Sequence, residues 1–132
     1  MEKRFIEPKD LRSWWSYIRP RLKQILRKSP EAWIPEDIYA DCFQGRSMLW
    51  VALENNKPQG FVVCQPTDEN TLHLWAGYSE NDCADLGGWS IIDDIAKQGG
   101  ASFITFDSWR KGWEKKAKAL GFSPKKYIRR VI

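Results

Sequence analysis

The chain has 132 residues, of which 42% are hydrophobic and 29% are charged, and its formal net charge is +4 at pH 7. This length and composition predict one globular domain, residues 1–132, with a single core, and they exclude an intrinsically disordered protein. The longest apolar run, Met48 to Leu53, is too short to cross a bilayer, so we expect no membrane partner. The segment from Met1 to Asp10 is charged and has no apolar run, so we expect no secretory signal.

The cysteine and histidine content limits the chemistry that the chain can perform. Cys42, Cys64 and Cys83 are odd in number and have no CxxC spacing, so we expect free thiols in a reducing, cytoplasmic environment. His73 is the only histidine, which excludes a His-rich metal site and argues against zinc bound by Cys and His. We therefore predict no metal site. The eight tryptophans indicate a core that is built from large rings.

A basic amphipathic helix is predicted near the N-terminus. Apolar residues recur at spacings of three and four from Leu11 to Leu26, and Asp10 is a suitable N-cap. Pro20 is expected to kink or split this helix near Ile18. The opposite face carries Arg12, Arg19, Arg21, Lys23, Arg27 and Lys28, which we interpret as a solvent-exposed face.

The rest of the chain alternates between apolar strands and amphipathic helices. In chain order we predict an edge strand Arg4–Ile6, a helix Glu36–Gln44 after Pro35, a hairpin of strands Met48–Leu53 and Gly60–Gln65, a strand Leu72–Ala76, a helix Asp82–Gln98, a strand Phe103–Phe106, a helix Trp109–Leu120 and a strand Tyr127–Ile132. Gly77 suggests a bulge or a close backbone approach after the third central strand, and Gly121 suits a left-handed helix cap. This order predicts an α+β fold, a three-layer sandwich with a mixed, mostly antiparallel central sheet and helices on both faces.

The order of elements at this length resembles the GNAT acetyltransferase superfamily. The segment Ala117-Lys118-Ala119-Leu120-Gly121-Phe122 is similar to the family's late Tyr-x-x-Leu-Gly-Phe motif. Three further segments, Ile34–Tyr39, Leu49–Val51 and Arg110–Glu114, more closely resemble small GNAT-like proteins of bacteriophages and prophages. The resemblance covers nearly the whole chain and implies an N-acetyltransferase that moves an acetyl group from acetyl-CoA to an amine on a small molecule or a protein.

The resemblance also implies where acetyl-CoA would bind. The backbone of Leu74, Trp75, Ala76 and Gly77 would hold the pantetheine arm between the third strand and the strand at residues 103–106. Backbone amides at Asn81, Asp82 and Cys83 would hold the pyrophosphate, because the N-terminus of a helix favours anions.

Two features depart from the family pattern. The stretch from Glu80 to Asp94 contains several acids and no Lys or Arg, and acids near a pyrophosphate repel it. Ala117 stands where the family usually has a tyrosine that protonates the leaving thiolate. Tyr78 is a candidate replacement for that acid, and Glu80 and His73 are candidate general bases. The sequence favours the alternative for His73, a strand histidine that packing and one hydrogen bond satisfy.

Three functional hypotheses follow from these residues. The first is an active N-acetyltransferase. The second is a catalytically inactive GNAT-like phage or prophage protein, which acts as a binding or virion-associated module in the host cytoplasm or the virion. The third, a nucleic-acid binder, rests only on the basic segment from Trp109 to Ile132 and is the least favoured. Exposed tryptophans would be compatible with a homodimer.

Overall fold

The structure, a computed structural model, describes residues 2–28, 31–67, 70–80, 86–106 and 121. Its elements are strand β1 (Glu2–Ile6), a 3-10 turn (Pro8–Asp10), helices α1 (Leu11–Lys28) and α2 (Pro35–Phe43), strands β2 (Met48–Glu54), β3 (Lys57–Thr67) and β4 (Thr71–Ser79), helix α3 (Leu86–Gln98) and strand β5 (Phe103–Phe106). The predicted helix at residues 109–120, the last predicted strand at residues 127–132 and the start of the predicted helix at residues 82–85 lie outside the described residues. Gly121 has a φ of +88°, as its predicted role in a helix cap requires.

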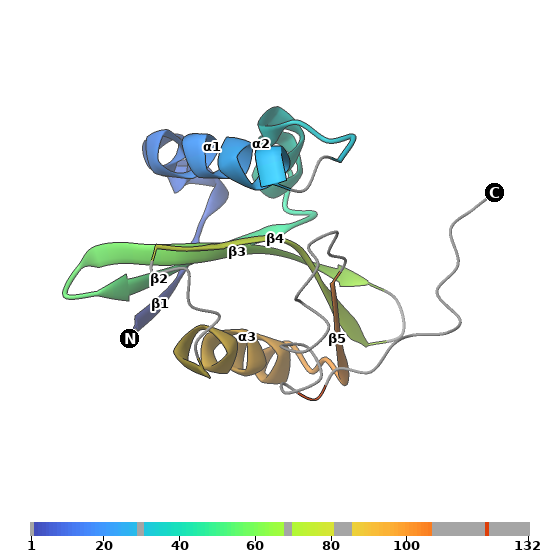
Figure 1. Cartoon of the computed structure of the whole chain (residues 1–132). Coiled ribbons are helices and arrows are strands. Elements are labelled where there is room, and N and C mark those ends of the chain that lie inside the picture. The colour runs from blue at the N-terminus through green and yellow to red at the C-terminus, as the bar shows by residue number, and fades with distance from the viewer. Residues whose placement is uncertain (1, 29–30, 68–69, 81–85, 107–120, 122–132) are drawn as a thin grey trace.

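Five strands form one sheet in the order β1-β2-β3-β4-β5. The first four strands pair antiparallel with their neighbours, and β5 pairs parallel with β4. Helices α1 and α2 lie on one side of the sheet and α3 lies on the other (Figure 1). The predicted α+β architecture, with a mixed and mostly antiparallel sheet between two helical layers, is confirmed.

The hairpin between β2 and β3 is tighter than the sequence suggests. Glu54 pairs directly with Lys57, so the turn consists of Asn55 and Asn56 alone. Their φ values are +51° and +62°, which is the left-handed backbone of a two-residue type I′ turn. Asparagine tolerates this conformation better than most residues, and this tolerance explains two consecutive asparagines at the turn.

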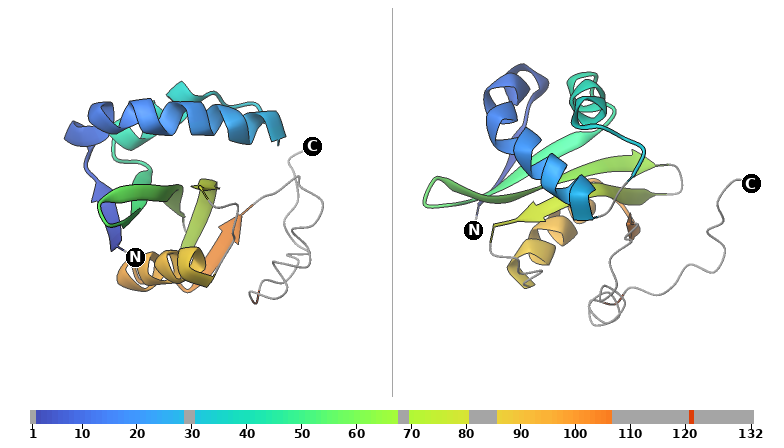
Figure 2. Two further views of the ribbon diagram at one scale, coloured as in Figure 1. Left: turned by 60° about the vertical axis from the view of Figure 1, so that its left-hand side comes forward. Right: turned by 45° about the horizontal axis from the view of Figure 1, so that its top comes forward.

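Helix α1 is one continuous helix (Figure 2) with Pro20 inside it, so the predicted split near Ile18 does not occur. Proline removes one backbone hydrogen bond from a helix. Ile18 and Leu22, on either side of it, are both 0% exposed and belong to one core cluster. Because both halves of the helix are buried against the same side of the sheet, tertiary packing holds them in line.

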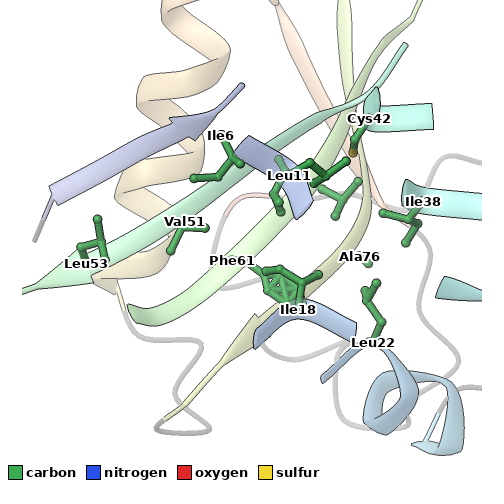
Figure 3. Close-up of a cluster of buried hydrophobic side chains, with 12 residues drawn as sticks. Ile6, Leu11, Ile18, Leu22, Ile38, Cys42, Val51, Leu53, Phe61 and Ala76 are labelled. Carbon is green, nitrogen blue, oxygen red and sulfur yellow. The ribbon is translucent and has the colours of Figure 1, made fainter. Parts of the chain in front are cut away.

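Each face of the sheet has its own apolar cluster. Between the sheet and helices α1 and α2 lie Ile6, Leu11, Ile18, Leu22, Ile38, Cys42, Leu49, Val51, Leu53, Phe61, Val63 and Ala76 (Figure 3). Trp14, Trp15, Trp33 and Trp75 pack against this cluster and are partly buried. Between the sheet and α3 lie Val62, Cys64, Leu72, Leu74, Trp89, Ile95 and Ala96. The strands of the hairpin and meander therefore contribute side chains to both clusters.

Candidate active site

Within the described residues, β5 pairs with only the first part of β4. The described register runs from Thr71 with Phe103 to Leu74 with Phe106, and the residues that follow Phe106 lie outside the described part of the chain. Strand β4 continues to Ser79, still paired with β3. No described strand pairs with the other edge of β4 after Leu74. It is along this edge of β4, beside β5, that the resemblance predicts cofactor binding.

A β-bulge lies at this point of β4. Val63 pairs with Ala76, but the next residue of β3, Cys64, pairs with Leu74, so Trp75 is the extra residue. The sequence suggested a bulge or a close backbone approach at Gly77, but Gly77 pairs regularly with Val62, so the bulge is not there. The extra residue is accommodated because the ring of Trp75 packs on the α1 and α2 side, 6.1 Å between centroids from Trp33.

The backbone of Gly77 is directed toward the unpaired edge. The N–H of Glu80 donates to the carbonyl of Gln59 on the β3 side, at 2.9 Å. Hydrogen-bonded pairs alternate along an antiparallel ladder, so Tyr78 also faces β3 with its backbone groups, whereas Gly77 and Ser79 face away from it. The N–H and C=O of Gly77 therefore project beyond the end of the β4–β5 pairing, where they can bind the amides of an extended ligand.

The predicted cofactor residues divide into two groups. Leu74, Trp75, Ala76 and Gly77 lie together where the strands separate. The fit of a pantetheine arm there rests on the backbone groups of Gly77, which face away from β3. Asn81, Asp82 and Cys83 lie outside the described residues.

Glu80, at the end of β4, is engaged by two side chains of α1. Nε of Arg21 donates to its Oε1 at 2.6 Å, and the hydroxyl of Tyr17 donates to the same oxygen at 2.9 Å. Burial pushes the pKa of Glu80 upward, but the hydrogen bonds from Arg21 and Tyr17 and the charge of Arg21 outweigh it and lower the pKa. Glu80 is therefore a carboxylate at neutral pH, and Arg21 neutralises one charge of the acidic stretch.

Aromatic rings surround this ion pair. The guanidinium of Arg21 lies 3.8 Å from the ring centroid of Tyr17 and 5.6 Å from that of Tyr78. Tyr78 stacks on Phe61, with 5.9 Å between the centroids. Burial, followed by the hydrogen bond to Glu80, raises the pKa of Tyr17, so its hydroxyl stays protonated and remains a donor. Tyr78, the candidate acid, thus lies beside Glu80, one of the candidate bases.

His73 lies elsewhere along β4. Its Nδ1 is 2.9 Å from Oγ1 of Thr105, its partner in the β4–β5 register. His73 is half-buried and precedes the last β4–β5 pair by one residue. The structure thus separates the candidate residues into His73, on the paired part of β4, and the pair Tyr78 and Glu80, on its unpaired part.

Arg21 and Tyr17 are site residues that the sequence did not indicate. The helical pattern placed Arg21 on the solvent-exposed face, but its side chain is only 26% exposed. Its position next to the fully buried Leu22 was the available signal, because a residue at the border of a buried stripe can reach the sheet.

The described residues contain no group of three or more His, Cys, Asp or Glu side chains that could hold a metal ion. Among the helices of the described residues, none combines the length and the apolar composition that a membrane span needs.

Comparisons with known proteins support the fold. No protein-family model and no curated protein matches the sequence. Among solved structures, a probable acetyltransferase superposes with a TM-score of 0.73 at 13% identity, over 100% of this chain and 97% of that one. A ribosomal-protein-alanine N-acetyltransferase from Brucella melitensis biovar Abortus 2308 gives 0.68 at 15% identity, over 100% and 99%. A predicted acetyltransferase from Clostridium acetobutylicum, solved with acetyl-CoA, gives 0.66 at 18% identity, over 99% and 95%. The chain has the fold of the GNAT acetyltransferases.

Proposed function

We propose that this protein is an N-acetyltransferase that binds acetyl-CoA along the unpaired edge of β4 and transfers the acetyl group to an amine. The observation that carries the proposal is that no described residue pairs with the outer edge of β4 after Leu74, next to the bulge at Trp75. The N–H and C=O of Gly77 project into this interruption and offer a donor and an acceptor to the amide groups of pantetheine.

Acetyl-CoA, when bound, supplies a thioester whose carbonyl carbon accepts the amine nitrogen while the carbon–sulfur bond breaks. The protein has to remove a proton from the amine, and that proton ends on the sulfur of CoA. Glu80 is a carboxylate beside the unpaired edge and can accept a proton, and Tyr78 lies next to it as a candidate donor to sulfur. His73 is the alternative base, held by Thr105.

The ion pair of Arg21 and Glu80 favours this proposal over the inactive alternative. The acidic residues that follow β4 argue against a bound pyrophosphate, but Arg21 compensates the first of them. The alanine at position 117 supports the alternative. In that alternative the protein is an inactive phage or prophage module in the host cytoplasm or the virion. We propose a homodimer under either alternative.

The test is calorimetric titration with acetyl-CoA and with CoA, on the unaltered chain and on two variants of Gly77. Gly77→Pro removes the N–H that faces the unpaired edge, whereas Gly77→Ala keeps it. The added Cβ would lie 3.8 Å from the nearest described atom, the carbonyl oxygen of Phe61, so the alanine variant is a fair control. We expect binding to the unaltered chain and to Gly77→Ala, and weaker binding to Gly77→Pro by about three- to tenfold, which is the contribution of one hydrogen bond.

Melting temperatures of both variants separate a folding defect from a binding defect, because proline is tolerated on a strand edge that makes no ladder hydrogen bond. If the unaltered chain binds neither acetyl-CoA nor CoA at millimolar concentration, the proposal is wrong and the inactive module is favoured. Equal affinity of Gly77→Pro and Gly77→Ala would show that the ligand lies elsewhere.

A further inference from the structure

We infer that Arg21 selects an acceptor that carries a carboxylate next to its amine, as a free amino acid does. This inference rests on the proposed acetyl transfer and names the class of acceptor for the same site. It depends on an oppositely charged, partly exposed pair, Arg21 and Glu80, at the end of the unpaired part of β4.

Arg21 is held in a fixed position, and one of its guanidinium nitrogens has no hydrogen-bond partner among the described residues. Its Nε donates to Glu80, and its Nη1 donates to the backbone carbonyl of Tyr17 at 2.8 Å. Its guanidinium plane lies against the ring of Tyr17. Among the described residues no hydrogen bond involves Nη2 of Arg21. A guanidinium that is already ordered loses little entropy when it binds a carboxylate, so Arg21 is prepared for an anionic group.

Glu80 is prepared for the opposite charge. Both α1 donors, Arg21 and Tyr17, bind its Oε1. Its side chain is 29% exposed, and a hydrogen bond with the Tyr78 side chain adds to those from Arg21 and Tyr17 in lowering its pKa, so Glu80 presents a negative charge at the surface of the site. The two side chains together present a positive and a negative group side by side. An amino acid has the complementary arrangement, because its ammonium and carboxylate are attached to one carbon atom.

Other amines do not match both charges. The N-terminus of a peptide has an amide where an amino acid has a carboxylate, and a polyamine or an amino sugar has no anion near the amine. Such acceptors would place a second cation beside Arg21 with Glu80 as the single negative group for two positive charges, which is unfavourable in a partly desolvated site. The pair therefore disfavours these acceptors as well as favouring a zwitterion.

Binding of the substrate carboxylate to Arg21 also assists removal of a proton from the substrate ammonium. When the substrate carboxylate engages Arg21, Glu80 loses part of the positive charge that stabilises its anionic form, and its proton affinity rises. The substrate ammonium can then give one proton to Glu80, and the neutral amine attacks the thioester carbon. As the carbon–sulfur bond breaks, the second amine proton passes to the CoA sulfur, and Glu80 returns its proton to solvent.

A different pair on the same helix serves as a control. Arg19 and Glu36 lie 3.0 Å apart and connect α1 to α2, but their side chains are 41% and 51% exposed. No aromatic contact is found for either residue within the described part of the chain. A pair of this kind joins two surface helices and provides no site beside the unpaired strand edge.

The experiment measures product binding, which needs no turnover. N-acetylalanine and N-acetylphenylalanine are titrated beside their methylamides, with CoA present, on the unaltered chain and on Arg21→Gln, Glu80→Gln and Arg19→Gln. We expect the acids to bind at least about tenfold more tightly than the methylamides, because a charge-assisted contact to Arg21 is lost in the amide. The ratio should approach one in Arg21→Gln and stay unchanged in Arg19→Gln.

The Glu80→Gln variant separates recognition from a structural role. Removal of Glu80 frees Arg21 from its competitor, so the acids should bind more tightly than to the unaltered chain. If the pair only fastened α1 to β4, Arg21→Gln and Glu80→Gln would weaken acids and methylamides alike. That result, or equal affinity of acids and methylamides in the unaltered chain, would overturn the inference. The titration with CoA alone reports on the proposed function independently of both outcomes.

Discussion

Nε of Arg21 and Oε1 of Glu80 lie 2.6 Å apart, although 59 positions separate the two residues in the sequence. The contact joins the middle of α1 to the end of β4, directly beyond the part of β4 with which no described residue of β5 pairs. It therefore connects the packing of the helical layer with the chemistry of the candidate site.

Replacement of Glu80 by glutamine should lower the free energy of unfolding at neutral pH by about 1 kcal/mol, because the charged hydrogen bonds from Arg21 and Tyr17 are lost or weakened. The pKa of Glu80 is lowered in the folded chain. Its contribution to stability is therefore complete above the ordinary carboxyl pKa and is lost as the pH falls through the lowered value. Urea denaturation at neutral and acidic pH should show a gap between the two proteins that closes in acid.

The matched control is Glu36→Gln, which removes the partner of Arg19. Because that pair is more exposed, we expect a smaller effect at neutral pH. An effect of Glu80→Gln that persists unchanged in acid would contradict the ion-pair explanation.

The helical pattern of α1 identified its buried stripe correctly, and Leu11, Ile18 and Leu22 are all buried. The same pattern could not identify the partner of Arg21. Periodicity reports which face of a helix is apolar, but the polar residue that reaches a distant strand depends on how the helix crosses the sheet, and this crossing is a tertiary property. A residue at the border of the stripe was therefore interpreted as solvent-exposed.

A methyl group added at Gly60 should destabilise the protein by about 2 to 3 kcal/mol. The Cβ of Gly60→Ala would lie 2.3 Å from the backbone oxygen of Tyr78, and that oxygen cannot move without separating β3 from β4. Gly77→Ala, on the neighbouring strand, should change stability by less than about 1 kcal/mol, because its Cβ has ordinary contacts. Urea titration followed by tryptophan fluorescence measures both, and similar midpoints would mean that β3 and β4 are less closely apposed than described.

The end of α2 is fastened to β3 through Asp41, which accepts hydrogen bonds from Oγ of Ser47 at 2.7 Å, Nε2 of Gln65 at 3.2 Å and Nε of Arg46 at 3.0 Å. Asp41→Asn replaces one acceptor oxygen by a donor, so we expect a loss of about 1 to 3 kcal/mol in unfolding free energy. Arg46→Gln should have little effect, because the Arg46 side chain is 65% exposed. Chemical denaturation of the two variants distinguishes them, and a larger effect at Arg46 would reverse our assignment of the main contacts.

The meander could be predicted because each strand is an apolar run bounded by turn residues, such as Asn55 and Asn56. Gly77 suggested a bulge or a close backbone approach from its residue type, but the extra residue is Trp75, whose ring packs beside Trp33 in the tertiary structure. A sequence pattern can indicate that a strand contains a bulge. It does not locate the bulge, because the position depends on tertiary packing.

Cys42 and Cys64 should be unreactive in the native protein. Burial raises the pKa of each thiol to about 12, with smaller contributions from Asp41 at Cys42 and from Cys42 at Cys64. The thiolate, which is the reactive form, is then scarce at mildly alkaline pH, and both sulfurs are inaccessible to reagents. In a Cys83→Ser variant, which leaves these two thiols alone, a disulfide reagent should react slowly with the native chain and rapidly once guanidinium chloride unfolds it. Rapid reaction of either thiol before unfolding would show that its core cluster opens locally, because a thiolate cannot form at an appreciable level while the cluster stays packed.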